Sequence, residues 1–397
     1  MRLTFLTHFP GRGGSTSLLS QLADFFRSRG HAVSVIVGSD CEDPILRDYA
    51  VVPAASPWRE RIAVYRTEIE RTKPDLIYSI SGKEEYDVLR FLQCPRVRHI
   101  SSLEQNEYVD IPLWLRQMDG YTEAITANTP DVLEQIRLIQ GHPGRNLMAP
   151  YRIAPVFFSV PDVGANPRPP ASALQICFVG RLETFLKRVH WLPDAVARCK
   201  KAGSLFQWHI YGSGPAEASL KDQITKRGCE ADVVFHGWLD AAALARELPQ
   251  RDVCFFCSRS EGLPVAMVEA MLCGTACVAP EIRAGIYYLL GQGGGWMYQA
   301  HSSAHAANAL LAATADRNLL YKKRVEAQTV ARSLFNEQTV LVQLNELERQ
   351  LVNLRFNGRA LILNHAARMR PVPISVAVKR RLMRCISIVM GNPIPRT

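Results

Sequence analysis

The hydrophobic residues of the chain form short apolar runs that alternate with amphipathic stretches. The first run is RLTFLTHF, and a glycine-rich loop, PGRGG, follows it at residues 10–14. The next stretch has apolar residues at helical spacing, and Gly30 is placed to end that helix before a second apolar run, HAVSVIVG. Strands buried on both faces have such runs, so the pattern predicts a β-α-β unit of a parallel sheet. The apolar helix positions are Leu18, Leu19, Leu22, Phe25 and Phe26.

The same alternation continues to the end of the chain. PDLIYSI, RVRHISSL, AITAN and NLMAPYRIA are predicted strands, and a helix is predicted over residues 130–139. LQICFVG, FQWHIYG, ADVVFHG, DVCFFCS and TACVAP are predicted strands of the second half, with helices such as 192–201 and 216–227 between them. A long helical region covers roughly residues 319–354. This order predicts the α/β class, with two parallel sheets.

A proline-rich segment, PDVGANPRPPAS, interrupts the alternation at residues 161–172. A chain of 397 residues is long enough for two domains. We therefore predict an N-terminal Rossmann-like domain over residues 1–160 and a second α/β domain over 173–335. Residues 336–351 are predicted to form a closing helix that packs back toward the first domain, and residues 352–397 a basic tail.

The net charge of +10 is concentrated in this tail, which has nine basic residues and no acidic ones. Such a tail binds anionic lipid or nucleic acid, or is a solvated end. Residues 376–390 interleave apolar and basic positions, as an interfacial helix does. No run is long enough to span a membrane, and MRLTFLTHFPGRGG lacks the apolar core of a signal peptide. We expect a cytoplasmic protein, with docking of residues 352–397 on the inner face of a membrane as a further hypothesis.

Two cysteine pairs, Cys254 with Cys257 and Cys273 with Cys277, have a spacing that resembles a zinc site. Both pairs lie in or beside apolar runs, where small buried thiols are the better interpretation. We predict no metal site.

Two glutamates mark the segment SRSEGLPVAMVEAMLCG at residues 258–274. Pro264 suits the first turn of a helix and Gly274 its end. Glu269 is the one charge on this apolar helix, and Glu261 precedes the helix N-terminus, where free amides attract anions. Two acids beside an anion site suit the hydroxyl groups of a sugar and a ribose; the alternative is that both form salt bridges within the fold.

Two cations, Arg181 and Lys187, lie in the loop that follows a predicted strand, VGRLETFLKR. Ligands of open α/β folds bind at the carboxyl ends of strands, where two cations would stabilise a departing diphosphate. A solvated basic loop is the alternative. Gly212 and Gly237 end two other strands and allow a base or phosphate to approach the backbone.

The order and spacing of these four segments resemble glycosyltransferase family 4, the retaining transferases of GT-B fold, most strongly over about residues 174–345. Its signature is similar to EGLPVAMVEAMLCG. The resemblance implies two Rossmann-like domains that face a central cleft, an acceptor-side domain and a nucleotide-sugar-binding domain. It implies that Arg181 and Lys187 bind the diphosphate, Glu261 the donor sugar and Glu269 the ribose. The other implied substrate-binding residues are Gly13, Gly14, Gly212, Gly237, Gly262, Leu263 and Pro264.

The chain departs from this family pattern in two places. The family often has a histidine of the first domain close to the reacting sugar; His99 is the nearest match, although it falls early, and His8 is its competitor. The segment at residues 281–290, EIRAGIYYLL, lacks the usual Gly-Gly and acidic residue that contact the donor sugar.

We therefore predict a retaining, metal-independent glycosyltransferase without a cofactor. Its donor would be a UDP- or GDP-sugar and its acceptor a glycan or lipid-linked sugar, in surface polysaccharide or glycolipid synthesis of the bacterial type. No nucleic-acid partner is expected. The alternatives are a non-catalytic nucleotide-sugar-binding subunit and a sugar-nucleotide epimerase of the same fold. A nicotinamide dehydrogenase is disfavoured, because Thr16 occupies the last position of the G-x-G-x-x-G motif.

Overall fold

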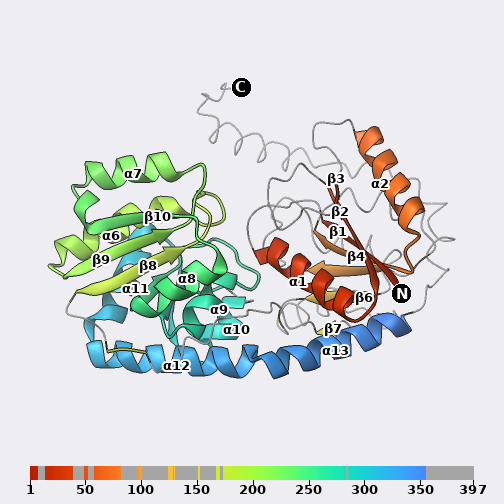
Figure 1. The fold of residues 1–397 in the computed structure, drawn as a ribbon. Helices are drawn as coiled ribbons and strands as arrows, with labels where there is room; N and C mark the ends of the chain where they lie inside the picture. The colour runs from red at the N-terminus through yellow and green to blue at the C-terminus, as the bar shows by residue number, and fades with distance from the viewer. Residues whose placement is uncertain are drawn as a thin grey trace, which may run out of the picture. The chain divides into compact units, whose positions relative to one another are not determined.

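The computed structural model describes residues 1–7, 14–38, 49–51, 58–81, 94, 96–100, 124–127, 129, 151–152, 167–169, 173–282 and 285–354. Within these ranges the strands form two sheets, and neighbouring strands pair in parallel (Figure 1). The predicted α/β class is confirmed.

The first sheet has β1 near its centre and the order β3-β2-β1-β4-β5-β6-β7. Helix α1 (Gly14–Ser28) buries the predicted apolar positions Leu18, Leu19 and Leu22 in its core. There the ring of Phe5 lies 5.4 Å from that of Tyr78. The bounds are β1 (Arg2–Thr7), β2 (Ala32–Val37), β3 (Ala50–Val51), α2 (Trp58–Thr72), β4 (Leu76–Ser81), β5 (Arg96–Ile100), β6 (Ala124–Ala127) and β7 (Tyr151–Arg152).

The second sheet has the order β10-β9-β8-β11-β12-β13 and an apolar core on each face. Trp208 and Phe255 belong to one core, and Tyr211 and Met267 to the other. The strands are β8 (Leu174–Val179), β9 (Phe206–Tyr211), β10 (Val233–Gly237), β11 (Val253–Phe255), β12 (Ala276–Pro280) and β13 (Gly295–Tyr298). The helices are α6 (Leu192–Lys201), α7 (Glu217–Lys226), α8 (Ala241–Glu247), α9 (Val265–Leu272), α10 (Gly285–Leu290) and α11 (Ser303–Ala315), with 3-10 turns at Val189–Trp191, Glu230–Asp232 and Leu248–Gln250.

Cys254 and Cys257 contribute to opposite cores of this sheet, because they are three positions apart along an extended segment, and an odd offset places two side chains on opposite faces. Their zinc-like spacing therefore does not bring the two thiols to one point. In the described ranges no helix has the length and hydropathy needed to cross a bilayer.

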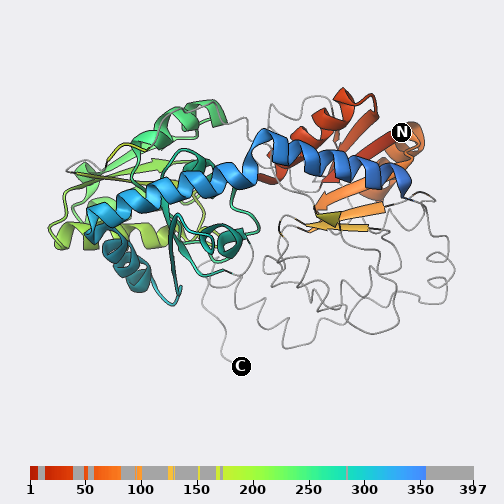
Figure 2. The same cartoon turned by 90° about the horizontal axis from the view of Figure 1, so that it is seen from below.

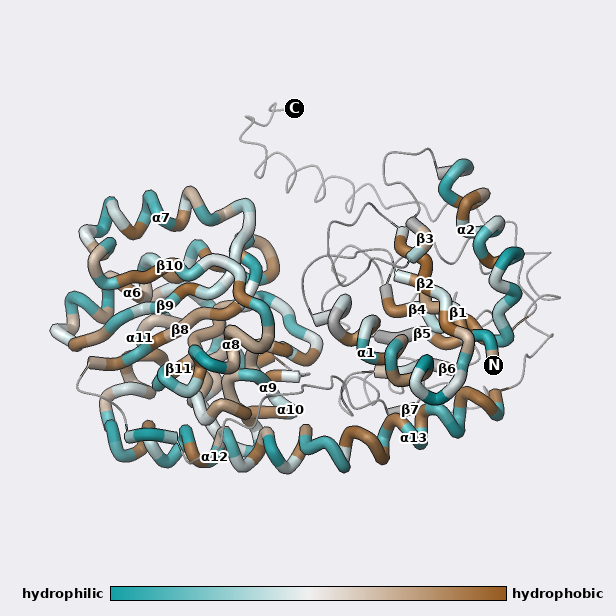
Figure 3. The backbone as a smooth tube through the Cα atoms, in the orientation of Figure 1, coloured by the Kyte–Doolittle hydropathy of each residue, from teal (hydrophilic) through white to brown (hydrophobic). Residues whose placement is uncertain are grey.

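The long helical region consists of α12 (Arg317–Phe335) and α13 (Glu337–Asn353), with Asn336 between them (Figure 2). The side-chain oxygen of Asn336 accepts the N–H of Thr339 at 2.8 Å and so caps α13. Hydrophilic and hydrophobic segments alternate along both helices (Figure 3). Ala327 of α12 packs in a core of the second sheet, whereas Leu344 of α13 packs in the core of the first.

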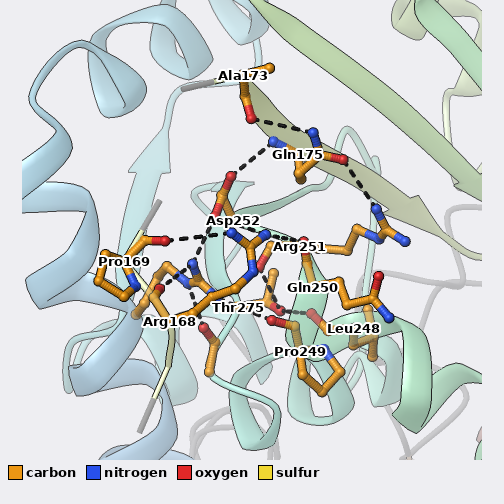
Figure 4. A network of polar contacts seen from close by, with 12 residues as sticks. Arg168, Pro169, Ala173, Gln175, Leu248, Pro249, Gln250, Arg251, Asp252 and Thr275 are labelled. Atoms are coloured by element: carbon orange, nitrogen blue, oxygen red, sulfur yellow. Dashed lines mark hydrogen bonds and ion pairs between the residues drawn. The ribbon is translucent and has the colours of Figure 1, made fainter. Parts of the chain in front are cut away.

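A buried polar network attaches residues 167–169 to the amino ends of β8 and β11 (Figure 4). Arg324 of α12 donates to Oδ1 of Asp252 at 2.7 Å and to the carbonyl of Arg168 at 2.8 Å. The other carboxylate oxygen of Asp252 accepts the N–H of Gln175 at 2.9 Å. Burial lowers the pKa of Arg324 to about 10, so the guanidinium stays charged at neutral pH. The ion pair is fully buried, which makes it a rigid joint between α12, this segment and the sheet.

Candidate functional site

The carboxyl ends of β10, β9, β8 and β11 meet at one edge of the second sheet, because these four strands are parallel neighbours. The loops that leave this edge contain the predicted residues Arg181, Lys187, Gly212 and Glu261, and Gly237 is the last residue of β10. This is the edge at which open α/β folds bind ligands.

Lys187 and Glu261 form an ion pair at this edge. The Lys187 ammonium donates to Oε1 of Glu261, and the hydroxyl of Ser258 donates to the same oxygen at 2.6 Å. The Glu261 side chain is 6% exposed and that of Lys187 27%. A buried carboxylate needs such donors, and the two contacts on Oε1 supply them. Of the residues predicted to be catalytic, Arg181, Lys187, Glu261 and His99, the structure thus brings Lys187 and Glu261 into direct contact.

Arg181 lies in the same loop as Lys187, and its side chain is exposed. The loop is anchored by its neighbours: Gly180 donates its N–H to the carbonyl of Tyr211 at 3.0 Å, and Leu182 donates to that of Ser213 at 2.9 Å. No hydrogen bond or ion pair to another described residue engages the Arg181 guanidinium. It is therefore available to an anion at this edge.

Glu269 lies on α9, half-buried and without a hydrogen-bond partner among the described residues. Removal from water raises the pKa of its carboxyl to about 7. The sequence predicted that Glu269 lies at the edge of the apolar face of this helix, and its half-buried side chain is consistent with that prediction. A carboxyl of this kind gains most from a ligand hydroxyl that restores its hydrogen bonds.

The predicted glycines allow close backbone contacts between the loops. A Cβ on Gly212 would lie 1.9 Å from the carbonyl oxygen of Gly180. The N–H of Gly212 donates to the carbonyl of Gly237 at 2.7 Å, and Gly237 has a φ of +70°, which disfavours other residues. These contacts keep the ends of β8, β9 and β10 close together.

Gly262, Leu263 and Pro264 are buried between Glu261 and α9. Pro264 is the N-cap residue, with φ −72° and ψ 103°, so its predicted place in the first turn is wrong by one position. A proline there still suits a helix start, because proline lacks the backbone N–H that would have no acceptor in the helix.

Three predicted residues belong to the first half of the chain. Gly14 begins α1, and His99 lies in β5 with its Cα paired to that of Thr126; the structure describes only the backbone of His99. Gly13, and the competing histidine His8, fall outside the described residues. The roles suggested for these residues remain predictions.

Three further residues that build the site were not predicted from the sequence. Ser258 donates to Glu261, and the Glu183 carboxylate accepts backbone N–H groups of the loop that holds Lys187. In the altered 281–290 segment, Gly285 donates its N–H to the carbonyl of Gly262 at 2.6 Å, and a Cβ there would lie 2.0 Å from that oxygen. The sequence does contain a signal for each of them. Glu183 lies between the loop cations Arg181 and Lys187, Ser258 lies three residues before Glu261, and Gly285 is the one glycine in residues 281–290.

The part of the chain that contains this site is similar to known proteins. Residues 173–316 match the model of the family described as glycosyl transferases group 1. Escherichia coli (strain K12) WcaL, which has the provisional name of a colanic acid biosynthesis glycosyltransferase, is 29% identical over 197 residues, 47% of this chain and 48% of WcaL. The amylovoran biosynthesis glycosyltransferase AmsK of Erwinia amylovora is 28% identical over 185 residues, 45% of each chain. The chain thus spans about half the length of the curated relatives it matches.

Solved structures extend the likeness of the fold to most of the chain. Anabaena HepE in complex with UDP-glucose has a TM-score of 0.70 and 20% identity, over 89% of this chain and 99% of HepE. Sucrose-phosphate synthase from Thermosynechococcus elongatus has a TM-score of 0.70 and 17% identity, with the same coverage of 89% and 99%. The chain therefore has the GT-B fold, and its residues 173–316 match the family model of the glycosyl transferases group 1.

Proposed function

We propose that this protein is a glycosyltransferase that moves a sugar from a nucleoside-diphosphate donor to a glycan or lipid-linked acceptor in polysaccharide or glycolipid synthesis. The observation that carries the proposal is the Lys187–Glu261 ion pair beside the exposed Arg181 at the carboxyl edge of the second sheet. An ammonium and a guanidinium at this edge suit a diphosphate, and the adjacent carboxylate suits sugar hydroxyls.

In the proposed reaction, Arg181 and Lys187 stabilise the negative charge that grows on the departing diphosphate. Glu261 holds Lys187 at the site through Oε1, while its Oε2 remains for a hydroxyl of the donor sugar. A donor phosphate would draw the Lys187 ammonium away from the Glu261 carboxylate, so that the ammonium pairs with the phosphate instead. Cations that are in place before the reaction need little reorganisation in the transition state.

Glu269 is proposed to bind the donor ribose. Its carboxyl has a pKa of about 7 and no described partner, so two ribose hydroxyls would replace the hydrogen bonds it lost on burial. Hydroxyl donors favour the charged form, and we expect donor binding to lower this pKa.

The retaining outcome and the independence from metal are parts of the proposal. The acceptor hydroxyl attacks the face of the sugar from which the diphosphate departs, and a phosphate oxygen accepts its proton. The names of WcaL and AmsK, which refer to colanic acid and amylovoran, support a polysaccharide acceptor. The HepE complex supports a sugar nucleotide as donor.

The test is a transfer assay with UDP- and GDP-sugars in the presence of EDTA, after a thermal-shift screen of UDP, GDP and ADP. A nucleotide that binds should raise the melting temperature, and the rise should grow with the logarithm of the ratio of its concentration to its Kd. We expect transfer by the wild type with retention of the anomeric configuration. Tight donor binding without turnover across acceptors would instead indicate a binding subunit, and conversion of the donor without any acceptor an epimerase; either result would contradict the proposal.

A further inference from the structure

The loop between β8 and the turn Val189–Trp191 is folded around the carboxylate of Glu183. Oε2 accepts the backbone N–H of Phe185 at 2.8 Å and that of Leu186 at 3.1 Å. Oε1 accepts the N–H of Lys187. Successive N–H groups that point to one anion form a concave anion-binding nest, and hydrogen bonds to a carboxylate are about twice as strong as neutral ones.

The backbone carbonyls of Leu186 and Lys187 are hydrogen-bonded to the segment that follows β11 and contains Glu261. Cys257 donates its thiol to the carbonyl of Lys187 at 3.1 Å, and Arg259 donates its N–H to the carbonyl of Leu186 at 2.7 Å. Cys257 is fully buried, so this tie is fixed in the core. The backbone of Lys187 is therefore held at its N–H by Glu183 and at its carbonyl by Cys257.

Glu183 also determines what kind of anion site the loop can be. Because its carboxylate already accepts three backbone N–H groups, these groups are not available to an incoming phosphate. The phosphate must then be met by side-chain cations, and their position depends on the backbone that Glu183 holds.

We propose that Glu183 is a positioning residue: it fills the amide nest of the loop and so fixes Lys187 where its ammonium meets the leaving diphosphate. The inference rests on the proposed glycosyltransferase function. Glu183 acts through Lys187 and does not itself touch the donor. If Lys187 acts on charge that develops during bond cleavage, a misplaced ammonium lowers kcat more than it raises the KM for the donor.

The test compares the full-length wild type with Glu183→Ala, Glu183→Asp and Glu183→Gln in the transfer assay, using the UDP- or GDP-sugar that the wild type accepts. We expect Glu183→Ala to lower kcat by about 10- to 100-fold, the scale of a small misplacement of a catalytic group, with the donor KM changed about threefold or less. Glu183→Gln keeps an acceptor oxygen and should recover part of the rate. Glu183→Asp is too short to reach all three N–H groups and should fall between Glu183→Ala and the wild type.

The matched control is Asp316→Ala. Asp316 likewise accepts two backbone N–H groups, those of Asn318 at 2.8 Å and Leu319 at 3.0 Å, but at the start of α12. The Asp316→Ala substitution should lower the melting temperature without changing kcat. A kcat within about twofold of the wild type in Glu183→Ala, or a fall matched by Asp316→Ala at equal melting temperature, would overturn the inference. A wild type that transfers no sugar would overturn the proposed function itself, and the inference with it.

Discussion

Lys187 and Glu261 stand 74 residues apart in the chain and form an ion pair at the ends of two adjacent strands, β8 and β11. Each side chain is the counter-ion of the other, and Ser258 adds a second donor to the carboxylate. The ammonium is thus held at the edge of the sheet before any phosphate arrives. Because one carboxylate oxygen takes both contacts, the pair leaves the other oxygen for a ligand.

The first prediction concerns the charge of Glu261. Glu261→Gln should lower kcat/KM for sugar transfer by about 100-fold, because the neutral amide binds a sugar hydroxyl less strongly in the transition state. Binding of the free nucleoside diphosphate should be retained or tightened, since Lys187 loses its competing anion. Steady-state kinetics and calorimetric titration measure the two effects. The control is Glu217→Gln, which breaks the exposed pair with Lys221. Loss of diphosphate binding in Glu261→Gln but not in the control would argue that Lys187 does not exchange the Glu261 carboxylate for the donor phosphate.

The second prediction concerns the pH dependence that Glu269 confers. Its pKa rises from 4.5 to about 7 on folding, so the folded protein keeps a proton that the unfolded chain has released. Stability should therefore fall as pH rises from 4.5 to 7, by up to about 3 kcal/mol from this group, and should not change further above that range. Glu269→Gln should remove this slope. Urea unfolding between these pH values checks it, and equal slopes in both proteins would contradict the assignment.

The third prediction concerns the buried pair of Arg324 and Asp252. Arg324→Met removes the nearer cation from the buried Asp252 carboxylate and leaves only the Arg168 guanidinium at 3.7 Å, which should cost up to about 3–5 kcal/mol of unfolding free energy. Lys226→Met, which breaks the exposed pair with Asp222, should cost less than about 1 kcal/mol. Denaturant unfolding of both variants gives the comparison. Similar losses in the two would show that the buried network does not anchor α12.

The fourth prediction concerns the basic residues beyond α13. If residues 352–397 dock on an anionic membrane, replacing Lys379, Arg380, Arg381 and Arg384 by Gln should weaken binding to phosphatidylserine vesicles by about 1 kcal/mol per charge. Cosedimentation at physiological salt measures this. Equal sedimentation of wild type and variant would exclude an electrostatic role for these four residues.

The periodicity of apolar residues predicted most strands of both sheets, because strands buried on both faces stand out as apolar runs. It missed β13, a four-residue edge strand that begins at Gly295 after two further glycines. It also missed α2, which is rich in charged residues and buries few side chains, such as Tyr65 and Ile69. Short or weakly amphipathic elements depend on tertiary packing, and local pattern does not reveal them.

For the site, the sequence predicted that Arg181 and Lys187 lie at the carboxyl edge of the sheet, where ligands of open α/β folds bind, and the family resemblance added Glu261 to the same donor site. It did not predict that Glu261 binds Lys187, because that contact depends on how two loops fold. Glu183 was missed for the same reason: its partners are backbone N–H groups, which are present at every residue and give no signal in a sequence. Gly285 was missed because its constraint is the distance to Gly262.

We propose that side-chain cations, and not a divalent ion, neutralise the donor diphosphate. Calorimetric titration of the wild type and of the Arg181→Ala/Lys187→Ala double variant with UDP and GDP in EDTA tests it most directly. We expect the wild type to bind one of these nucleotides without metal and the double variant to bind it at least about 100-fold more weakly, since two charge-assisted contacts are lost. Equal binding by the two proteins, or binding by the wild type only after a divalent cation is added, would contradict it.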